Sequence, residues 1–297
     1  MGVAMAPDRM SFAVLGPGGV GGLLAGLLSR GGDPVVVLHD SAPREIHVES
    51  KRFGDFTSEV RTAPRLAESV DAVLVTVKAT QLDDALERMP ASALGDALVI
   101  PFLNGIEHVE HLRGVYPPSS VVPATIRVET TKVAPGVIRH TSPFAVVDIG
   151  PRGEPVGAHL RAAGLDVRIK DDENAMLWDK MAVLAPMALL TTHERGNIGE
   201  VRVRRRDDLE ALVREFASVA AAEGVQIDPV ANLAFIEKAP DTMETSMQRD
   251  QAAGRPIELD ALGGALLRRA AKAGIQVPVT ERIVGDLKKR SLTVKSA

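Results

Sequence analysis

Short apolar runs alternate with longer mixed segments through the first half of the chain. The runs are rich in Val, Leu and Ile and have the length of buried strands. They lie at residues 12–16, 35–39, 71–77 and 97–103. Between the first two, residues 20–31 (VGGLLAGLLSRG) predict an apolar helix that Gly31 and Gly32 end, and residues 81–89 predict another helix. Strands and helices that alternate in this way predict a parallel, doubly wound α/β sheet.

The pattern changes after residue 120. Residues 121–150 contain short β-rich runs broken by Pro135 and Gly136, which predict an antiparallel hairpin that closes the α/β domain. Residues 165–172 (LDVRIKDD) predict a last strand followed by a hinge.

The second half of the chain has apolar residues at helical spacing. Three segments show this most clearly. They are residues 173–192, 207–224 and 258–274. Pro186 lies inside the first segment and predicts a kink there. This helical spacing of apolar residues predicts an all-helical C-terminal domain.

Composition narrows the class of protein. The chain has 297 residues, 45% hydrophobic and 25% charged, as in globular proteins. A net charge of −4 favours neither a nucleic-acid nor a membrane partner. The absence of Cys removes disulfides and cysteine metal sites, and we expect no bound metal. Residues 1–10 lack the features of a signal peptide, so we expect a flexible extension and a cytoplasmic protein.

A glycine motif follows the first predicted strand. Gly16, Gly18 and Gly21 have GxGxxG spacing and open a predicted helix, and Asp40 ends the second strand about 20 residues further on. One glycine allows the tight turn, one lets the backbone approach a pyrophosphate, and one lets helix and strand pack. The helix N-terminus offers N–H groups to the phosphates. The alternative is a purely structural strand–helix turn.

These observations divide the chain by function. We expect the extension at 1–10, a Rossmann-like dinucleotide-binding domain at 11–170, and a helical substrate or catalytic domain at 171–297. The whole turn from Gly16 to Gly21 is assigned to the cofactor. It comprises Gly16, Pro17, Gly18, Gly19, Val20 and Gly21. Hydride chemistry belongs to the nicotinamide, so the protein must orient the substrate and supply one proton. We expect this to happen in the cleft between the domains.

Seven motifs occur in the order found in one known family. They are AVLGPGGVGG, VTVKATQ, FLNGIE, PGVIRH, LWDKMAV, SMQRDQAAGRPIELD and AKAGIQVPVT. Together they resemble the ketopantoate reductases, also called 2-dehydropantoate 2-reductases, from about residue 12 to 290. The resemblance implies NADPH-dependent reduction of ketopantoate to pantoate, a step toward pantothenate and coenzyme A.

The resemblance assigns roles to residues of the helical half. Lys180 in LWDKM matches the catalytic lysine, which gives its proton to the carbonyl oxygen. Glu258 in RPIELD matches a glutamate that hydrogen-bonds the substrate hydroxyl, and Pro256 predicts that it lies in the first turn of a helix. Ser246 matches a serine that contacts the substrate carboxylate, and Asp250, four residues later on the same helix face, matches an acid of the same site.

Two further matches lie in the α/β half. Asn104 in FLNGIE follows a predicted strand and matches an asparagine near nicotinamide and substrate. Lys78 in VTVKATQ matches a lysine that contacts the cofactor. Without the resemblance, each would be an ordinary loop residue.

The chain departs from the family at two places. The family usually has asparagines four and eight residues after the catalytic lysine, where this chain has Leu184 and Ala188. It usually also has Arg at the end of the second strand, to bind the 2′-phosphate of NADP, where this chain has Asp40. The resemblance implies NADP(H), whereas Asp40 favours NAD(H) or relaxed specificity. A ketopantoate hydroxyl would lose a partner at Leu184, unless Thr191 or His193 replaced it.

The prediction is therefore an oxidoreductase that reduces ketopantoate or a related small 2-oxo acid with NAD(P)H, with a homodimer possible. One alternative is a dehydrogenase of a less polar oxo acid. Another is a dinucleotide-binding sensor without catalysis, although Lys180 and Glu258 argue against it.

Overall fold

The computed structural model describes residues 8–295, and the chain divides into two compact units. The first unit runs to Leu103 and resumes over His108–Met176, and the second comprises Asn104–Glu107 and the chain from Leu177 onward. The sequence pattern predicted this boundary after residue 170. Of the predicted extension at 1–10, residues 1–7 lie outside the described residues.

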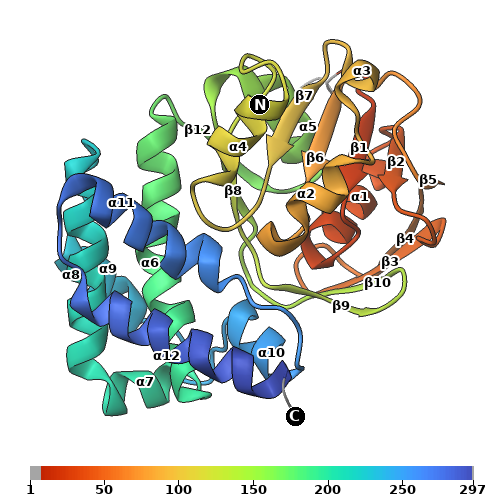
Figure 1. Ribbon diagram of the computed structural model, residues 1–297. Coiled ribbons are helices and arrows are strands. Elements are labelled where there is room, and N and C mark those ends of the chain that lie inside the picture. The colour runs from red at the N-terminus through yellow and green to blue at the C-terminus, as the bar shows by residue number, and fades with distance from the viewer. Residues whose placement is uncertain (1–7, 296–297) are drawn as a thin grey trace, which may run out of the picture. The chain divides into compact units, whose positions relative to one another are not determined.

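The first unit is built on a five-stranded parallel sheet (Figure 1). Its order is β5 (Arg61–Ala63), β2 (Val35–Leu38), β1 (Phe12–Leu15), β6 (Ala72–Val75) and β7 (Leu98–Pro101). Strands β1, β2 and β6 are buried at every residue, as expected for a parallel sheet covered on both faces. The predicted parallel α/β sheet is confirmed.

Helix α1 (Gly19–Arg30) connects β1 to β2 and is the best-buried helix of this unit. The later connections use shorter elements. They are η1 (Ala79–Gln81), α2 (Leu82–Leu86), α3 (Ala91–Leu94) and α4 (His108–Val115). On α1, a Cβ added to Gly22 would lie 2.5 Å from Cδ1 of Ile138. The glycines of this helix therefore let a second sheet approach it closely.

That second sheet has the order β4 (Phe56–Glu59), β3 (Glu45–Ser50), β10 (Val137–His140) and β9 (Thr130–Ala134). Strands β9 and β10 form the predicted antiparallel hairpin, and Gly136 takes a positive φ of 73° in its turn. Strand β10 also pairs in parallel with β3, about 90 residues earlier in the chain, which the sequence pattern did not predict.

A third sheet has the order β12 (Asp166–Ile169), β11 (Val146–Ile149) and β8 (Ala124–Arg127). The connection from β11 to β12 contains η2 (Pro151–Gly153) and α5 (Glu154–Ala162). The predicted last strand corresponds to β12.

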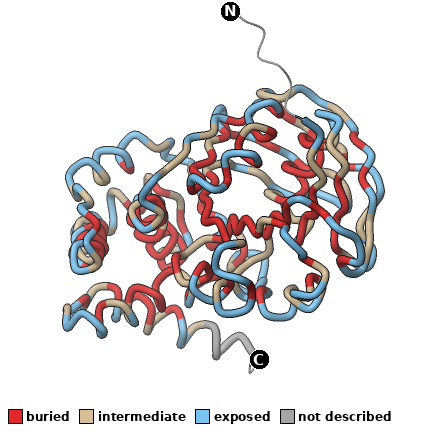
Figure 2. The backbone as a smooth tube through the Cα atoms, turned by 90° about the horizontal axis from the view of Figure 1, so that it is seen from above, coloured by how far each residue is buried: buried red, intermediate tan, exposed pale blue. Residues whose placement is uncertain are grey.

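The second unit is helical (Figure 1). Its elements are α6 (Glu173–Glu194, in this unit from Leu177), α7 (Ile198–Arg204), α8 (Arg206–Ala222), α9 (Pro229–Glu237), α10 (Ser246–Ala252), the π-helical η3 (Asp260–Gly264), α11 (Ala265–Ala273) and α12 (Pro278–Lys295). Helix α6 continues through Pro186 for its full length. Figure 2 shows buried and exposed stretches alternating along the helices of this unit.

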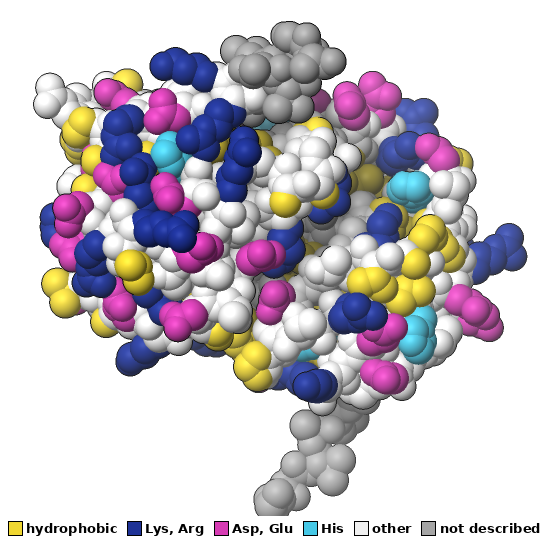
Figure 3. Space-filling model, turned by 90° about the horizontal axis from the view of Figure 1, so that it is seen from below, with side chains coloured by type: hydrophobic (Ala, Val, Ile, Leu, Met, Phe, Trp, Pro, Cys, Tyr) yellow, Lys and Arg dark blue, Asp and Glu magenta, His cyan; other side chains and the backbone are white. Residues whose placement is uncertain are grey.

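Charges of both signs are mixed on the surface shown in Figure 3. The basic run at residues 201–206 illustrates this, because Arg202 pairs with Asp241 and Arg206 pairs with Glu210. Within residues 8–295, no helix is both long enough and apolar enough to cross a membrane.

Candidate functional site

The glycine turn has the geometry that a pyrophosphate requires. Gly16 takes a φ of +101°, and its carbonyl accepts a hydrogen bond from the Gly18 N–H at 2.8 Å. A Cβ on Gly21 would lie 2.2 Å from that carbonyl oxygen, so only glycine lets α1 pack against the turn. A Cβ on Gly18 would meet no atom within 4 Å, so this backbone faces open space. Gly18 is also the N-cap of α1 and has no side chain to cap its first turn.

Two threonines border this turn. The Thr76 hydroxyl donates to the carbonyl oxygen of Gly16 at 2.8 Å and fixes the turn from β6. The Thr130 hydroxyl is buried and has no hydrogen-bond partner among the described residues, and a Cβ on Gly19 would lie 2.9 Å from it. A buried unpaired hydroxyl beside the turn fits a polar ligand there. Nothing in the sequence pattern indicated Thr130.

Lys78 is placed at the same edge of the sheet. It follows β6 and is the N-cap of η1, and it is half-buried. Since β6 lies next to β1, Lys78 and the glycine turn both follow the carboxyl ends of neighbouring parallel strands.

Asp40 forms an ion pair that the sequence did not reveal. Arg88 Nη1 donates to Oδ1 of Asp40 at 2.8 Å, and Nη2 donates to Oδ2 at 2.5 Å. The hydrogen bonds from Arg88 lower the pKa of Asp40 below its ordinary value. The position at which the family usually has Arg is therefore an aspartate that is itself held by an arginine, 48 residues away in the chain.

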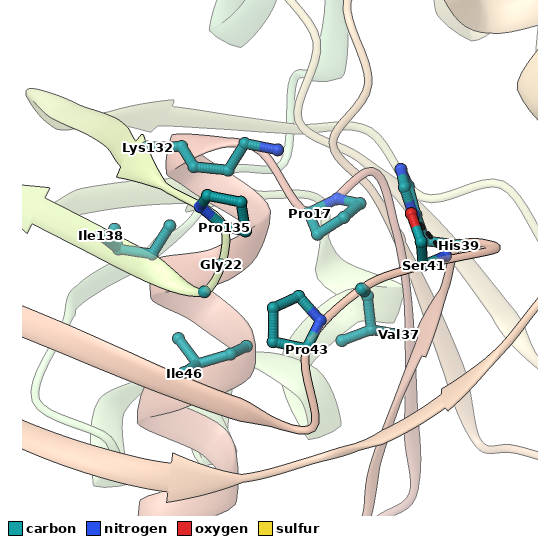
Figure 4. Close-up of a pocket in the computed structure, with 12 residues that line it drawn as sticks. Pro17, Gly22, Val37, His39, Ser41, Pro43, Ile46, Lys132, Pro135 and Ile138 are labelled. Carbon is teal, nitrogen blue, oxygen red and sulfur yellow. Dashed lines mark hydrogen bonds between the residues drawn. The ribbon is translucent and has the colours of Figure 1, made fainter.

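A pocket of about 120 Å³ lies between the glycine turn, the end of β2 and the β9–β10 hairpin (Figure 4). Its lining residues are Pro17, Gly22, Val37, His39, Ser41, Ala42, Pro43, Ile46, Lys132, Pro135, Gly136 and Ile138. Its walls are mainly apolar, with His39, Ser41 and Lys132 as polar members.

In the second unit, the structure brings together two predicted residues that are 154 positions apart. The Asn104 side-chain amide donates to Oε2 of Glu258 at 3.1 Å. Glu258 is buried, with 5% of its surface exposed, and Asn104 is half-buried. Lys180 is half-buried on α6 of the same unit and takes part in a polar interaction.

Glu258 differs in one respect from the prediction. It lies just before the helix rather than in its first turn, because its carbonyl accepts the N–H of Leu262 at 3.2 Å. Residues 255–258 form neither helix nor strand after Gly254, which has a φ of +66°, and the π-helix η3 follows.

An arginine ties the Asn104 loop to this helix start. Arg268 donates from Nη2 to Glu107 at 2.6 Å and from Nη1 to Asp260 at 2.9 Å. Glu107 and Asp260 both hold the pKa of Arg268 above its ordinary value. Gly105, with a φ of +92°, lies so close that its Cβ would be 2.6 Å from the carbonyl oxygen of Ala261. This contact explains why Asn104–Glu107 belong to the helical unit.

The Ser246 and Asp250 pair lies on α10, as predicted. Ser246 is exposed at the first turn, whereas Asp250 is buried and its Oδ1 accepts from Nε of Arg255 at 2.9 Å. Sequence analysis did not include Arg255.

The departures from the family lie on a continuous helix. Leu184 is half-buried and Ala188 is 1% exposed. Thr191 and His193, the residues that could replace the missing asparagines, already have partners in the helical unit. The Thr191 hydroxyl is buried and shares a 2.9 Å hydrogen bond with that of Thr245, and the buried His193 ring contacts Asp286.

Known proteins of one family match this sequence over nearly the whole chain. Residues 12–154 match the family model of ketopantoate reductase PanE/ApbA, and residues 172–291 match the model of its C-terminal part. A 2-dehydropantoate 2-reductase of Mycobacterium tuberculosis is 33% identical over 92% of this chain and 95% of its own.

Two solved structures share the fold. A PanE/ApbA family ketopantoate reductase from Ralstonia eutropha has a TM-score of 0.86 at 26% identity, covering 96% of this chain and 99% of its own. A D-mandelate dehydrogenase in complex with NADH and anilino(oxo)acetate has a TM-score of 0.88 at 20% identity, covering 96% and 100%.

Proposed function

Because the chain belongs to the ketopantoate reductase family, we propose that it reduces ketopantoate or a related small 2-oxo acid to the 2-hydroxy acid. The family makes it an NAD(P)-dependent oxidoreductase. The observation that carries the proposal is the hydrogen bond from Asn104 to the buried Glu258, in the unit that also holds Lys180. Asn104 and Glu258 lie in two different family motifs that are far apart in the sequence, and folding brings their side chains into contact.

We assign cofactor binding to the first unit. The open backbone at Gly18 and the buried, unpaired Thr130 hydroxyl support a pyrophosphate at the start of α1. Lys78, at the neighbouring strand end, is assigned to the same ligand. Bound NAD(P)H would supply the hydride to the carbonyl carbon of the substrate.

Lys180 is assigned as the proton donor. As the carbonyl carbon receives the hydride, negative charge develops on the carbonyl oxygen. The Lys180 ammonium stabilises this charge and transfers one proton to the oxygen, which leaves a hydroxyl group and a neutral lysine that water reprotonates.

The remaining residues position the substrate. Glu258, oriented by Asn104, accepts a hydrogen bond from a substrate hydroxyl, and the exposed Ser246 hydroxyl donates to the substrate carboxylate. Asp250 would repel that carboxylate directly. We therefore assign to Asp250 the role of holding Arg255, whose positive guanidinium can attract the substrate carboxylate.

Leu184 and Ala188 favour a less polar substrate as a second candidate. A ketopantoate hydroxyl that donates to Glu258 would find no second partner at Leu184, where the family usually has an asparagine, and losing that hydrogen bond would cost roughly 1–3 kcal/mol, or about 5- to 150-fold in efficiency. The test compares kcat/KM for ketopantoate and for 2-oxo acids of similar size without the hydroxyl. We expect the unhydroxylated acids to be preferred, and Leu184→Asn/Ala188→Asn to improve ketopantoate. High native efficiency with ketopantoate that the double substitution lowers would contradict this assignment.

For the cofactor, we propose relaxed use of NADH and NADPH. Arg88 holds both carboxylate oxygens of Asp40 and offsets their charge, so Asp40 selects neither for a ribose 2′-OH nor strongly against a 2′-phosphate. The test is kcat/KM with each cofactor in the native protein and in Asp40→Ala. A large native preference for either cofactor would contradict relaxed use.

We also propose a homodimer. Val230 and Phe235 on α9 are 73% and 60% exposed, which is unusual for large apolar side chains and suits a contact with a second copy. Light scattering of the purified protein tests this, and Phe235→Asp should favour the monomer.

A further inference from the structure

The pocket between the glycine turn and the β9–β10 hairpin lies where a ribose substituent is expected. In dinucleotide-binding folds, the ribose 2′ position lies at the end of the second strand. Here that strand is β2, and the pocket includes Val37 within it and His39 and Ser41 just after it. Pro17 of the glycine turn forms the adjacent wall (Figure 4). A nucleotide held at the turn would therefore direct its 2′ substituent toward this pocket.

The three residues after β2 alternate in direction. His39 and Ser41 line the pocket, whereas Asp40 does not and is held by Arg88 through both carboxylate oxygens. The chain bends at residues 40 and 41, directly after β2, and this bend leaves Asp40 outside the pocket lining. The carboxylate that would repel a phosphate is therefore turned away from the pocket and paired with a cation.

The polar groups that remain at the pocket are donors. The Ser41 N–H donates to Nδ1 of His39 at 3.1 Å, which leaves Nε2 of that ring to carry the proton and donate. The Ser41 hydroxyl is a second donor. Both belong to partly or fully exposed residues, so a ligand can reach them.

Lys132 supplies the charge. It lies on β9, and its side chain extends across the pocket with the ammonium group toward Pro17 (Figure 4). No ion pair or hydrogen bond of its ammonium is found within residues 8–295. An unpaired ammonium beside a hydroxyl and an imidazole N–H is the donor set of a phosphate monoester site.

We infer that this pocket binds the 2′-phosphate of NADP(H), with Lys132 as its main ligand and Ser41 and His39 as supporting donors. The inference deepens the proposed function and rests on its cofactor assignment. It places recognition of the 2′-phosphate on the β9–β10 hairpin instead of on the residue that ends β2.

The experiment uses two nucleotides that differ only in this group. Calorimetric titration of the purified, cofactor-free protein with 2′,5′-ADP and with 5′-AMP measures the contribution of the 2′-phosphate without any turnover. We expect 2′,5′-ADP to bind more tightly to the native protein. Lys132→Ala should weaken 2′,5′-ADP by roughly tenfold or more, as for a charge-assisted hydrogen bond, and leave 5′-AMP unchanged. Ser41→Ala should have a smaller effect of the same kind.

Lys51→Ala is the matched control, because Lys51 is an exposed lysine of the same unit outside the pocket. It should change neither affinity. Equal affinities of the native protein for the two nucleotides, no binding of either, or an unchanged 2′,5′-ADP affinity in Lys132→Ala would each overturn the inference. If the nucleotides behave as expected but no 2-oxo acid is reduced, the phosphate site stands and the proposed reaction fails.

Discussion

At the scale of single residues, the proposed reaction depends most on Lys180. We expect Lys180→Ala to lower kcat by roughly 10²–10⁴-fold, the usual contribution of a general acid. Affinity for NAD(P)H should change little, because the cofactor is assigned to the first unit and Lys180 lies in the second. Steady-state kinetics and fluorescence titration of bound NADPH measure the two quantities separately.

Lys272→Ala provides the control, since Lys272 is an exposed lysine in the last turn of α11 in the same unit. It should retain native turnover. Near-native kcat in Lys180→Ala would remove Lys180 from the proton transfer.

Residue roles could be predicted where local geometry alone sets them. The requirement for glycine at Gly16 and Gly21 follows from a strand–turn–helix pattern that spans ten residues, and the structure shows the close contacts that impose it. The pairs Asp40–Arg88 and Asn104–Glu258 join residues 48 and 154 positions apart. Such pairs arise only when the chain folds, so a single sequence gave no reason to connect their members. Arg88 also lies in the segment 81–89 that the sequence predicts to be a helix, where an exposed arginine needs no further explanation.

At the scale of elements, the loop 104–107 is fixed to the start of η3 by Arg268. We expect Arg268→Ala to lower kcat by roughly 10- to 100-fold, because loss of its bonds to Glu107 and Asp260 lets Asn104 shift relative to Glu258. Nucleotide affinity should stay native. Arg268→Lys should recover only part of kcat, since lysine cannot make the same forked contacts.

A variant of the neighbouring Arg269 serves as the control that distinguishes a loss of positioning from a loss of stability. It pairs with Glu223, which also accepts from the Trp178 indole, and so it supports packing in the same unit. Arg269→Ala should lower the melting temperature and keep kcat. If Arg268→Ala lowers only the melting temperature as well, Arg268 has no positioning role.

The hairpin sheet contains a histidine whose protonation opposes folding. His140 on β10 is 2% exposed and bonds Ser50 of β3 and Ser142, and burial lowers its pKa from the ordinary value near 6.5. Arg52 lowers this pKa further, while the Phe144 carbonyl and Glu129 oppose the shift. The unfolded chain therefore binds this proton more readily than the folded chain.

The contribution of neutral His140 to the free energy of unfolding is therefore fully present above about pH 6.5, the pKa of histidine in the unfolded chain. It is lost as the pH falls through the lower pKa of His140 in the folded protein, by at most about 1.4 kcal/mol per pH unit. Denaturant unfolding of the native protein and of His140→Gln between pH 7.5 and 5 should show a flatter acid slope in the variant. His111→Gln, at an exposed histidine, serves as the control. Parallel slopes for His140→Gln and the native protein would contradict this account.

Elements were predictable to the extent that their periodicity is local. The strands of the parallel sheet, the hairpin at Pro135–Gly136 and the long helix α6 follow from apolar runs and turn residues. The parallel pairing of β10 with β3 does not, because both strands have an ordinary alternating pattern that fits many partners. The position of Glu258 before its helix depends on the π-helical turn that follows, which has no sequence pattern of its own.

At the scale of the whole molecule, the proposed function assigns separate tasks to the two units. The glycine turn, Asp40 and the pocket around Lys132 belong to the first unit, and Lys180, Leu184, Asn104 and Glu258 belong to the second. We therefore propose that cofactor choice and substrate choice are governed by different residues in different units, and free energies of independent groups add.

We therefore expect the effects of Lys132→Ala and of Leu184→Asn/Ala188→Asn to be additive. The quantity to compare is the ratio of kcat/KM with NADPH to kcat/KM with NADH. Lys132→Ala should change this ratio equally in the native protein and in Leu184→Asn/Ala188→Asn, within about 0.5 kcal/mol or roughly twofold. Within the second unit the opposite should hold. Asn104→Ala and Glu258→Ala remove the two ends of one hydrogen bond, so their combined loss should be clearly smaller than the product of the separate losses. Strong coupling between Lys132 and the Leu184–Ala188 pair would mean that cofactor and substrate are recognised jointly, and the separation of tasks would be wrong.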